Sequence, residues 1–118
     1  MSLIAQPVET FNSFFDKPRK AYTEFLRNRA LKECEGVLHL TREFKTRHGL
    51  TLLCGGHLRN VVEVEGDFLI AKQRAIAAES VADMRAALAY LDSIKTANFE
   101  EIESLFMALT LIHGYNVN

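Results

Sequence analysis

The chain contains 118 residues, of which 48% are hydrophobic and 25% are charged, with 14 Lys and Arg against 15 Asp and Glu. This length predicts one domain, and the composition excludes a disordered or fibrous chain. The formal net charge of −1 excludes a uniformly basic nucleic-acid binder and an acidic mimic of DNA.

Cysteine content and hydropathy indicate the compartment. Cys34 and Cys54 are too few for a disulfide scaffold, so we expect reduced thiols, with a bond between the two left open at this stage. The N-terminal residues carry no Lys or Arg before a short apolar stretch, which argues against a secretory signal. The apolar run at residues 105–112 is too short for a membrane span, which needs about 20 residues. We expect a soluble, cytoplasmic protein without a membrane partner.

The N-terminal third is predicted to form two helices. Val8, Phe11 and Phe15 lie at helical spacing and predict a helix over residues 8–15. Asp16 is a suitable N-cap for a second helix over residues 17–33. The apolar stripe of that second helix is expected to lie in the core and consists of Ala21, Tyr22, Phe25, Leu26 and Ala30.

The middle of the chain is predicted to contain a short antiparallel sheet. Residues 50–54 and 57–65 have the pattern of strands, and the two glycines between them suit a two-residue hairpin turn. A second turn at residues 66–67 leads into a further strand over residues 68–70.

The stretch before Gly49 allows two interpretations. Residues 37–41 could form the first strand of the sheet. Alternatively, residues 37–48 form a helix with basic residues in its last turn, and Gly49 ends it in the left-handed conformation. The helix is the favoured interpretation.

The C-terminal third is predicted to be a helical hairpin. Residues 71–79 are rich in strong helix formers. Ser80 with Asp83 resembles a capping box, and Asn98 with Glu101 repeats that pattern before the last helix. The acidic residues at the start of the last helix suit the positive end of its dipole.

Together these elements predict an α+β fold. N-terminal helices precede a short antiparallel sheet around the Gly-Gly hairpin, and the C-terminal helical hairpin covers one face of that sheet. The alternative is an all-α bundle with only a minor hairpin.

The last helix is expected to end at Gly114, and from Leu105 onward it is apolar almost all round. Such a helix is buried on more than one side, either as the central core helix or in an interface with another subunit or protein. The predicted interface residues are Leu105, Met107, Leu111 and Ile112.

Charge is divided unevenly along the chain. Residues 1–60 hold ten Lys and Arg against six acids, a net +4, whereas residues 61–118 hold four against nine, a net −5. The halves could pair within the fold, between subunits or with a protein partner, or the basic stretch could contact a phosphate backbone. The predicted basic surface consists of Lys17, Arg19, Lys20, Arg27, Arg29, Arg42, Lys45 and Arg47.

Cys54 and His57 are the candidates for a metal or thiol site. They flank the predicted hairpin turn as a cross-strand pair, and both residue types are zinc ligands. A zinc motif usually joins two short clusters, however, and the sequence specifies neither a third residue nor an oxyanion donor. A buried structural cysteine is the preferred interpretation, and no metal, cofactor or small-molecule substrate is predicted.

The predicted function is that of a small non-enzymatic interaction module. Such a regulator, inhibitor or assembly accessory would bind another macromolecule, with a protein partner or a homodimer expected. Nucleic-acid binding through the basic N-terminal half is the first alternative, and a thiol or metal site at Cys54 and His57 is the second.

Overall fold

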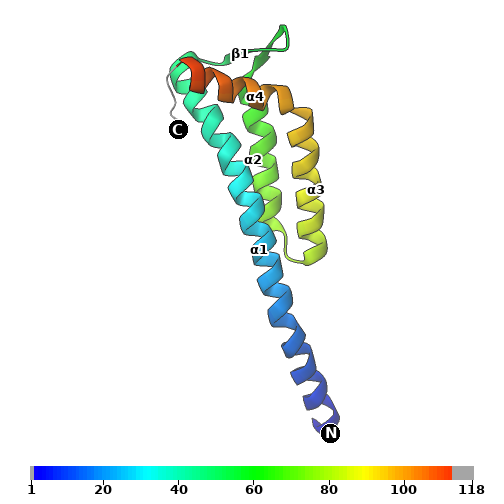
Figure 1. Ribbon diagram of the computed structural model, residues 1–118. Coiled ribbons are helices and arrows are strands. Elements are labelled where there is room, and N and C mark those ends of the chain that lie inside the picture. The colour runs from blue at the N-terminus through cyan, green and yellow to red at the C-terminus, as the bar shows by residue number, and fades with distance from the viewer. Residues whose placement is uncertain (1, 113–118) are drawn as a thin grey trace.

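The structure is a computed structural model that describes the backbone of residues 2–112 and the side chains of residues 18–110. A long helix is followed by a β-hairpin, three further helices and a short π-helical turn (Figure 1). The elements are α1 (Ser2–His48), β1 (Thr51–Cys54), β2 (His57–Asn60), α2 (Val61–Ala77), α3 (Val81–Ala97), α4 (Phe99–Met107) and η1 (Ala108–Ile112). The α+β prediction is confirmed, because the described part of the chain combines helices with a small antiparallel hairpin.

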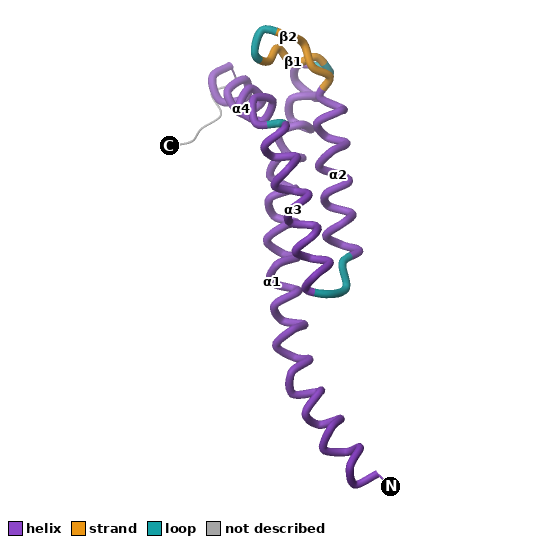
Figure 2. Tube along the Cα trace, turned by 90° about the vertical axis from the view of Figure 1, so that its right-hand side faces the viewer, coloured by secondary structure: helices purple, strands orange, loops and turns teal. Residues whose placement is uncertain are grey.

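One continuous helix, α1, replaces the two helices predicted at the N-terminus. Asp16 lies inside this helix instead of capping a second one. Pro18 lacks a backbone N–H and so costs α1 one hydrogen bond, but a single missing bond can bend a helix without ending it. Figure 2 shows that α1 curves along its length.

The C-terminal end of α1 resolves the ambiguity before Gly49 in favour of the helix. The helix runs to His48, and Gly49 follows with a φ of +84°. The Gly49 N–H donates to the Lys45 carbonyl oxygen at 3.2 Å. This is the left-handed stop that a glycine permits at little steric cost.

The hairpin has the predicted turn but shorter strands. Cys54 pairs with His57, and the intervening Gly55 and Gly56 have φ values of +55° and +82°, as a type I′ turn requires. The second strand, predicted to reach residue 65, ends at Asn60 instead. The Asn60 side chain accepts a hydrogen bond from the Val62 N–H at 2.9 Å and starts α2.

Helix α2 overturns the prediction of a turn at residues 66–67 and a strand over residues 68–70. Both stretches lie inside one helix, which also contains most of the predicted helix over residues 71–79. Valines and glutamates alternate before Gly66, which favours a strand, but the buried positions recur every three or four residues. These positions are Val61, Val64, Phe68, Ala71 and Ala75.

Helices α1, α2 and α3 pack side by side as a three-helix bundle (Figures 1 and 2). Its core residues are Leu26, Ala30, Cys34, Leu38, Val64, Phe68, Ala71, Ala75, Ala78, Met84, Ala87, Leu91 and Ile94. The predicted capping box joins α2 to α3. Ser80 Oγ accepts from the Asp83 N–H at 3.0 Å, and Asp83 Oδ2 accepts from the Glu79 N–H at 3.2 Å.

Helix α4 crosses the end of the bundle and packs against β1 (Figure 1). A second apolar cluster forms there from Phe44, Leu52, Cys54, Val61 and Leu105. The sheet is therefore packed mainly against α4, and not against a hairpin of two C-terminal helices, because α3 is committed to α1 and α2.

The second predicted capping box is wrong. The Asn98 side chain makes no capping bond. Its buried amide instead donates to Asp67 Oδ2 at 3.0 Å and to the Ile94 carbonyl oxygen at 2.9 Å. The predicted stop at Gly114 lies outside the described residues.

Helix α1 extends far beyond the bundle (Figures 1 and 2). The radius of gyration is 20.1 Å, whereas a compact domain of this length has about 13–14 Å. The bundle ends near Arg27, which donates hydrogen bonds to the carbonyl oxygens of Ala75 and Ala78 at the end of α2. Residues 2–25, called the projecting segment below, lead away from that end, and Thr23 is the one buried side chain among residues 18–25. Among the described helices, none has both the length and the apolar composition of a membrane span.

Candidate functional site

The projecting segment exposes aromatic side chains that the sequence assigned to the core. Tyr22 is 44% exposed and Phe25 is 61% exposed, whereas Leu26 is buried. Ala21 is also exposed. The prediction of a core position is therefore wrong for Ala21, Tyr22 and Phe25. Consecutive helix positions differ by about 100° around the axis, and the bundle covers the face on which Leu26 lies. No described element covers the other face, since Tyr22 and Phe25 are exposed beside the buried Thr23 and Leu26.

An apolar stripe runs along the same face of the projecting segment. Its positions are spaced alternately by four and three residues, as in a coiled coil, with Pro18 in one of the places. Positions at this spacing fall on one face of a helix such as α1. The stripe consists of Ile4, Val8, Phe11, Phe15, Tyr22 and Phe25.

The charges of this region change sign along α1. Residues 2–16 contain two acids, Glu9 and Asp16, and no Lys or Arg. Residues 17–32 contain six Lys and Arg and one acid. The helix is therefore acidic in its N-terminal part and basic where it enters the bundle.

Half of the predicted basic surface is already paired with acids of the same chain. The ion pairs are Arg27–Glu24, Arg42–Glu35, Lys45–Glu65 and Arg47–Glu43. Among the described side chains, Arg19, Lys20 and Arg29 are exposed and form no ion pair. The side chain of Lys17 lies outside the described residues.

The predicted interface on the last helix divides into three cases. Leu105 is fully buried in the cluster beneath the hairpin, so it belongs to the core of the monomer and offers no surface to a partner. Met107 is 49% exposed and stays available. Leu111 and Ile112 lie in η1, and their side chains are outside the described residues.

The hairpin and α4 bring a third residue to the predicted Cys54 and His57 pair. Donor atoms of Cys54, His57 and Glu101 all lie within 4.8 Å of one another. Cys54 and Glu101 are buried, whereas His57 is exposed. Sequence reasoning missed Glu101 because its place one turn into a helix suggested a capping role. Only the packing of α4 on β1 shows its neighbours.

Charged residues surround this group, called the hairpin cluster below. Arg59 Nη1 lies 2.5 Å from Glu101 Oε2, and Arg59 Nε lies 3.2 Å from Glu63 Oε2. A buried carboxylate is costly without such a partner. Glu100 Oε2 lies 2.6 Å from the point where a Cβ on Gly55 would stand, and His57 Cε1 lies 3.7 Å from the same point. A second carboxylate thus lies beside the turn.

The other thiol is remote from this group. Cys34 lies in the core of the three-helix bundle, and both cysteines are free, so the disulfide left open by the sequence does not form. Burial, with smaller contributions from Glu33 and Glu35, raises the pKa of Cys34 to about 11. A thiol of this kind stays protonated near neutral pH and is a poor nucleophile.

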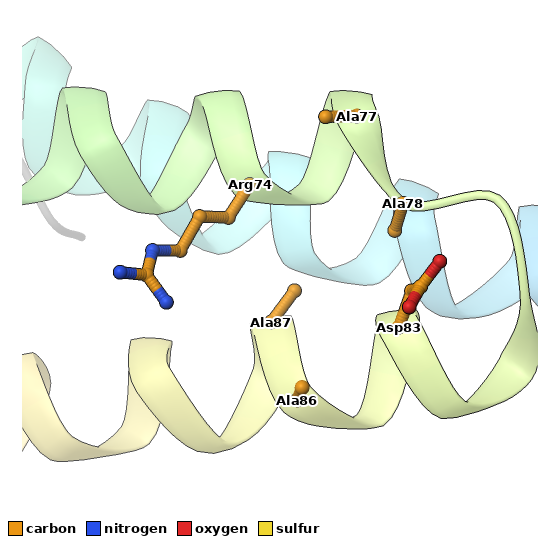
Figure 3. A pocket seen from close by; sticks show the side chains of 6 residues that line it. All are labelled: Arg74, Ala77, Ala78, Asp83, Ala86 and Ala87. Atoms are coloured by element: carbon orange, nitrogen blue, oxygen red, sulfur yellow. The ribbon is translucent and has the colours of Figure 1, made fainter.

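A cavity of about 270 Å³ lies between the end of α2 and the start of α3. Figure 3 shows its alanine-rich lining with Arg74 on α2 and Asp83 on α3. Both charged residues have structural partners, since Asp83 belongs to the capping box and Arg74 lies 4.1 Å over the Tyr90 ring. The cavity therefore lacks a free polar group that would orient a ligand.

Comparisons of the chain with protein-family models, with curated proteins and with solved structures give no match. The geometry of the projecting segment and of the hairpin cluster is therefore the basis for the functional argument.

Proposed function

We propose that this protein is a non-enzymatic interaction module that forms a homodimer by antiparallel pairing of two projecting segments. The main support for this dimer is the apolar stripe on a part of α1 that the described bundle leaves uncovered, where Tyr22 and Phe25 are exposed. Most helix stability in proteins comes from packing of an apolar face. Covering this stripe with a second copy removes aromatic surface from water, which favours association.

The antiparallel direction follows from the order of residues along the stripe. The stripe is nearly symmetric about residue 15, so Ile4 of one copy would lie opposite Phe25 of the other. The same arrangement places residues 2–13 of one copy, which contain Glu9 and no Lys or Arg, beside residues 17–28 of the other, which contain four Lys and Arg. Charge complementarity of this kind sets the orientation and register of a helix pair.

The length of the projecting segment also suits this arrangement. Residues 2–25 span about 36 Å as a helix. Residue 2 of each copy would then lie at the level of Arg27 of the other, where that copy's bundle begins. The two bundles would lie at opposite ends of the helix pair and would not collide.

Nucleic-acid binding would use the same basic residues. Internal ion pairs already occupy four of the eight, which weakens this alternative. In the proposed dimer, Arg19 and Lys20 would lie near Glu9 of the second copy. A cytoplasmic location fits two free thiols, because disulfides rarely form there.

The proposal is tested by light scattering coupled to size exclusion over a range of concentrations, comparing the wild type with Phe25→Glu. We expect the wild type to dimerise and the variant to dissociate at least about tenfold more readily, because a charged side chain replaces an apolar one within the paired stripe. Phe99→Glu is the matched control, because Phe99 is 63% exposed on α4 and lies outside the stripe. The control should dimerise as the wild type does.

Two outcomes contradict the proposal. One is a wild type that stays monomeric at hundreds of micromolar. The other is a Phe25→Glu variant that dimerises as tightly as Phe99→Glu. If the monomer instead retains duplex DNA or RNA with an affinity that falls steeply with salt, the nucleic-acid alternative replaces the dimer.

A further inference from the structure

The hairpin turn places Cys54 and His57, two residue types that bind metal ions, on one face of the sheet. Cys54 and His57 are directly opposed across the ladder, and opposed residues of an antiparallel pair project to the same side. Cys54 is buried, which shows that this side faces the protein interior. Cys and His in the order Cys-Gly-Gly-His have the short separation of a zinc-ligand pair.

Helix α4 supplies the third ligand type from the facing side. Glu101 is 5% exposed, so its carboxylate is held in the interior near Cys54 and His57. Arg59 binds one of its oxygens, Oε2, and so orients the carboxylate and leaves the other oxygen available. This resembles the outer-sphere support that metal-binding carboxylates usually have.

We propose that Cys54, His57 and Glu101 bind one Zn²⁺ ion per chain, with water as the fourth ligand. A thiolate, an imidazole and a carboxylate together suit this ion, which accepts sulfur, nitrogen and oxygen ligands in a tetrahedral arrangement. Donor atoms in such a site lie about 3.5 Å apart. The present limit of 4.8 Å requires only a small closure, which the exposed His57 ring can supply by rotation.

Binding of Zn²⁺ to these three side chains balances in protons and in charge. On binding, the Cys54 S–H bond breaks, the proton leaves to solvent and a zinc–sulfur bond forms, while neutral His57 donates a nitrogen lone pair. Two negative ligands neutralise the ion. Arg59 keeps Glu63 as a second partner, so no charge is left unpaired.

The bound ion would fasten the hairpin to α4. An isolated hairpin of two four-residue strands is marginally stable in water. Its outer face carries Leu53 and Leu58, which are directly opposed and about two-thirds exposed. Joining both ends of the turn to α4 would hold these leucines in a fixed position at the end of the molecule.

The test is titration of the reduced, metal-free full chain with Co²⁺, followed by displacement with Zn²⁺. We expect a thiolate-to-cobalt charge-transfer band that saturates at one ion per chain and disappears as Zn²⁺ replaces Co²⁺. His57→Ala should weaken Zn²⁺ binding at least about tenfold. Because His57 is exposed, this variant should keep the fold, which circular dichroism verifies. His39→Ala, at an exposed position on α1, is the matched control and should bind as the wild type does.

Three outcomes overturn the inference. They are a folded wild type without the charge-transfer band, a His57→Ala variant that binds Zn²⁺ as tightly as His39→Ala, and a band that persists in Cys54→Ala but is lost in Cys34→Ala. The inference does not rest on the dimer, and light scattering with and without a chelator separates the two. A dimer in chelator with no zinc binding would contradict only the metal site.

Discussion

Two parts of α1 have similar sequence patterns but differ in whether their apolar faces are buried. Residues 26–44 and the projecting segment are both helical, and both carry apolar residues at spacings of three and four. In the first part, α2, α3 and α4 cover the apolar face, and Leu26, Cys34 and Leu38 are buried. In the second part Tyr22 and Phe25 are exposed. Periodicity therefore indicates a face that should be covered, but it does not indicate what covers it.

Charged residues differ between these two parts in the same way. Within the bundle, Lys72 and Lys95 pair with Glu35 and Glu33 of α1. The hydrogen bond from Lys72, aided by Arg42, lowers the pKa of Glu35 below its ordinary value. Arg19 and Lys20, by contrast, form no ion pair among the described side chains. The bundle uses its charges internally, whereas those residues stay available to a second chain.

The largest expected difference is between two phenylalanines, one in each environment. Phe68 is fully buried in the bundle, so Phe68→Ala should lower the free energy of unfolding by about 3–5 kcal/mol. Phe25→Ala should change monomer stability by less than about 0.5 kcal/mol, because surface changes usually do. Urea unfolding at a concentration where the protein is monomeric measures both. Equal losses would contradict the division of α1.

A second effect depends on pH and concerns the buried thiol in the bundle part of α1. Burial raises the pKa of Cys34 from 9.0 to about 11, so the unfolded chain ionises first. The contribution of this thiol to the free energy of unfolding is fully present below pH 9. The free energy of unfolding should fall by about 2–3 kcal/mol as the pH rises through 11. Urea unfolding at pH 8 and near pH 11 measures the loss. Cys34→Ala serves as the control and should lack this component, whereas an identical pH profile in both proteins would refute it.

Charge reversal in the basic part of α1 should have a smaller effect. Lys20→Glu is expected to weaken the dimer about tenfold at low salt, because the new carboxylate would lie near Glu9 of the second copy. The difference should shrink at high salt as the charges are screened. Arg85→Glu, at an exposed position on α3, is the matched control. Sedimentation equilibrium measures the dissociation constants, and equal effects of the two reversals would argue against antiparallel pairing.

The smallest expected effect separates bundle stability from dimerisation. Ser80→Ala removes the side-chain cap of α3 and should lower the free energy of unfolding by about 1 kcal/mol. Ser93→Ala, at an exposed position inside the same helix, should be neutral or slightly stabilising. Thermal unfolding and light scattering should show that neither change alters self-association. A weaker dimer in Ser80→Ala would show that the two parts of the molecule are coupled.

Local rules were sufficient for the end of α1, the hairpin turn and the cap of α3. Gly49 ends α1, the two glycines form the hairpin turn, and Ser80 caps α3, all as the sequence predicts. Each outcome depends on a conformation or a hydrogen bond within a few residues, so no knowledge of distant packing is needed.

The hairpin cluster was predictable only in part, for the same reason. Cys54 and His57 are joined by a two-residue turn, and the sequence alone places them opposite one another. Glu101 is more than 40 residues away along the chain, and its role depends on how α4 crosses β1. The Asn98 side chain likewise donates a hydrogen bond to Asp67 of α2 and does not cap its own helix, α4.

The sequence by itself determined the helical character of both ends, the position of the hairpin and the uneven division of charge. The tertiary structure decided which apolar faces find a partner within the chain, because burial depends on where other elements end. Tyr22 and Phe25 lie on a face of α1 that the bundle leaves uncovered and stay exposed, whereas Leu26 faces the bundle and is buried. One residue along α1 thus separates a core position from a surface position, since it turns the side chain by about 100°.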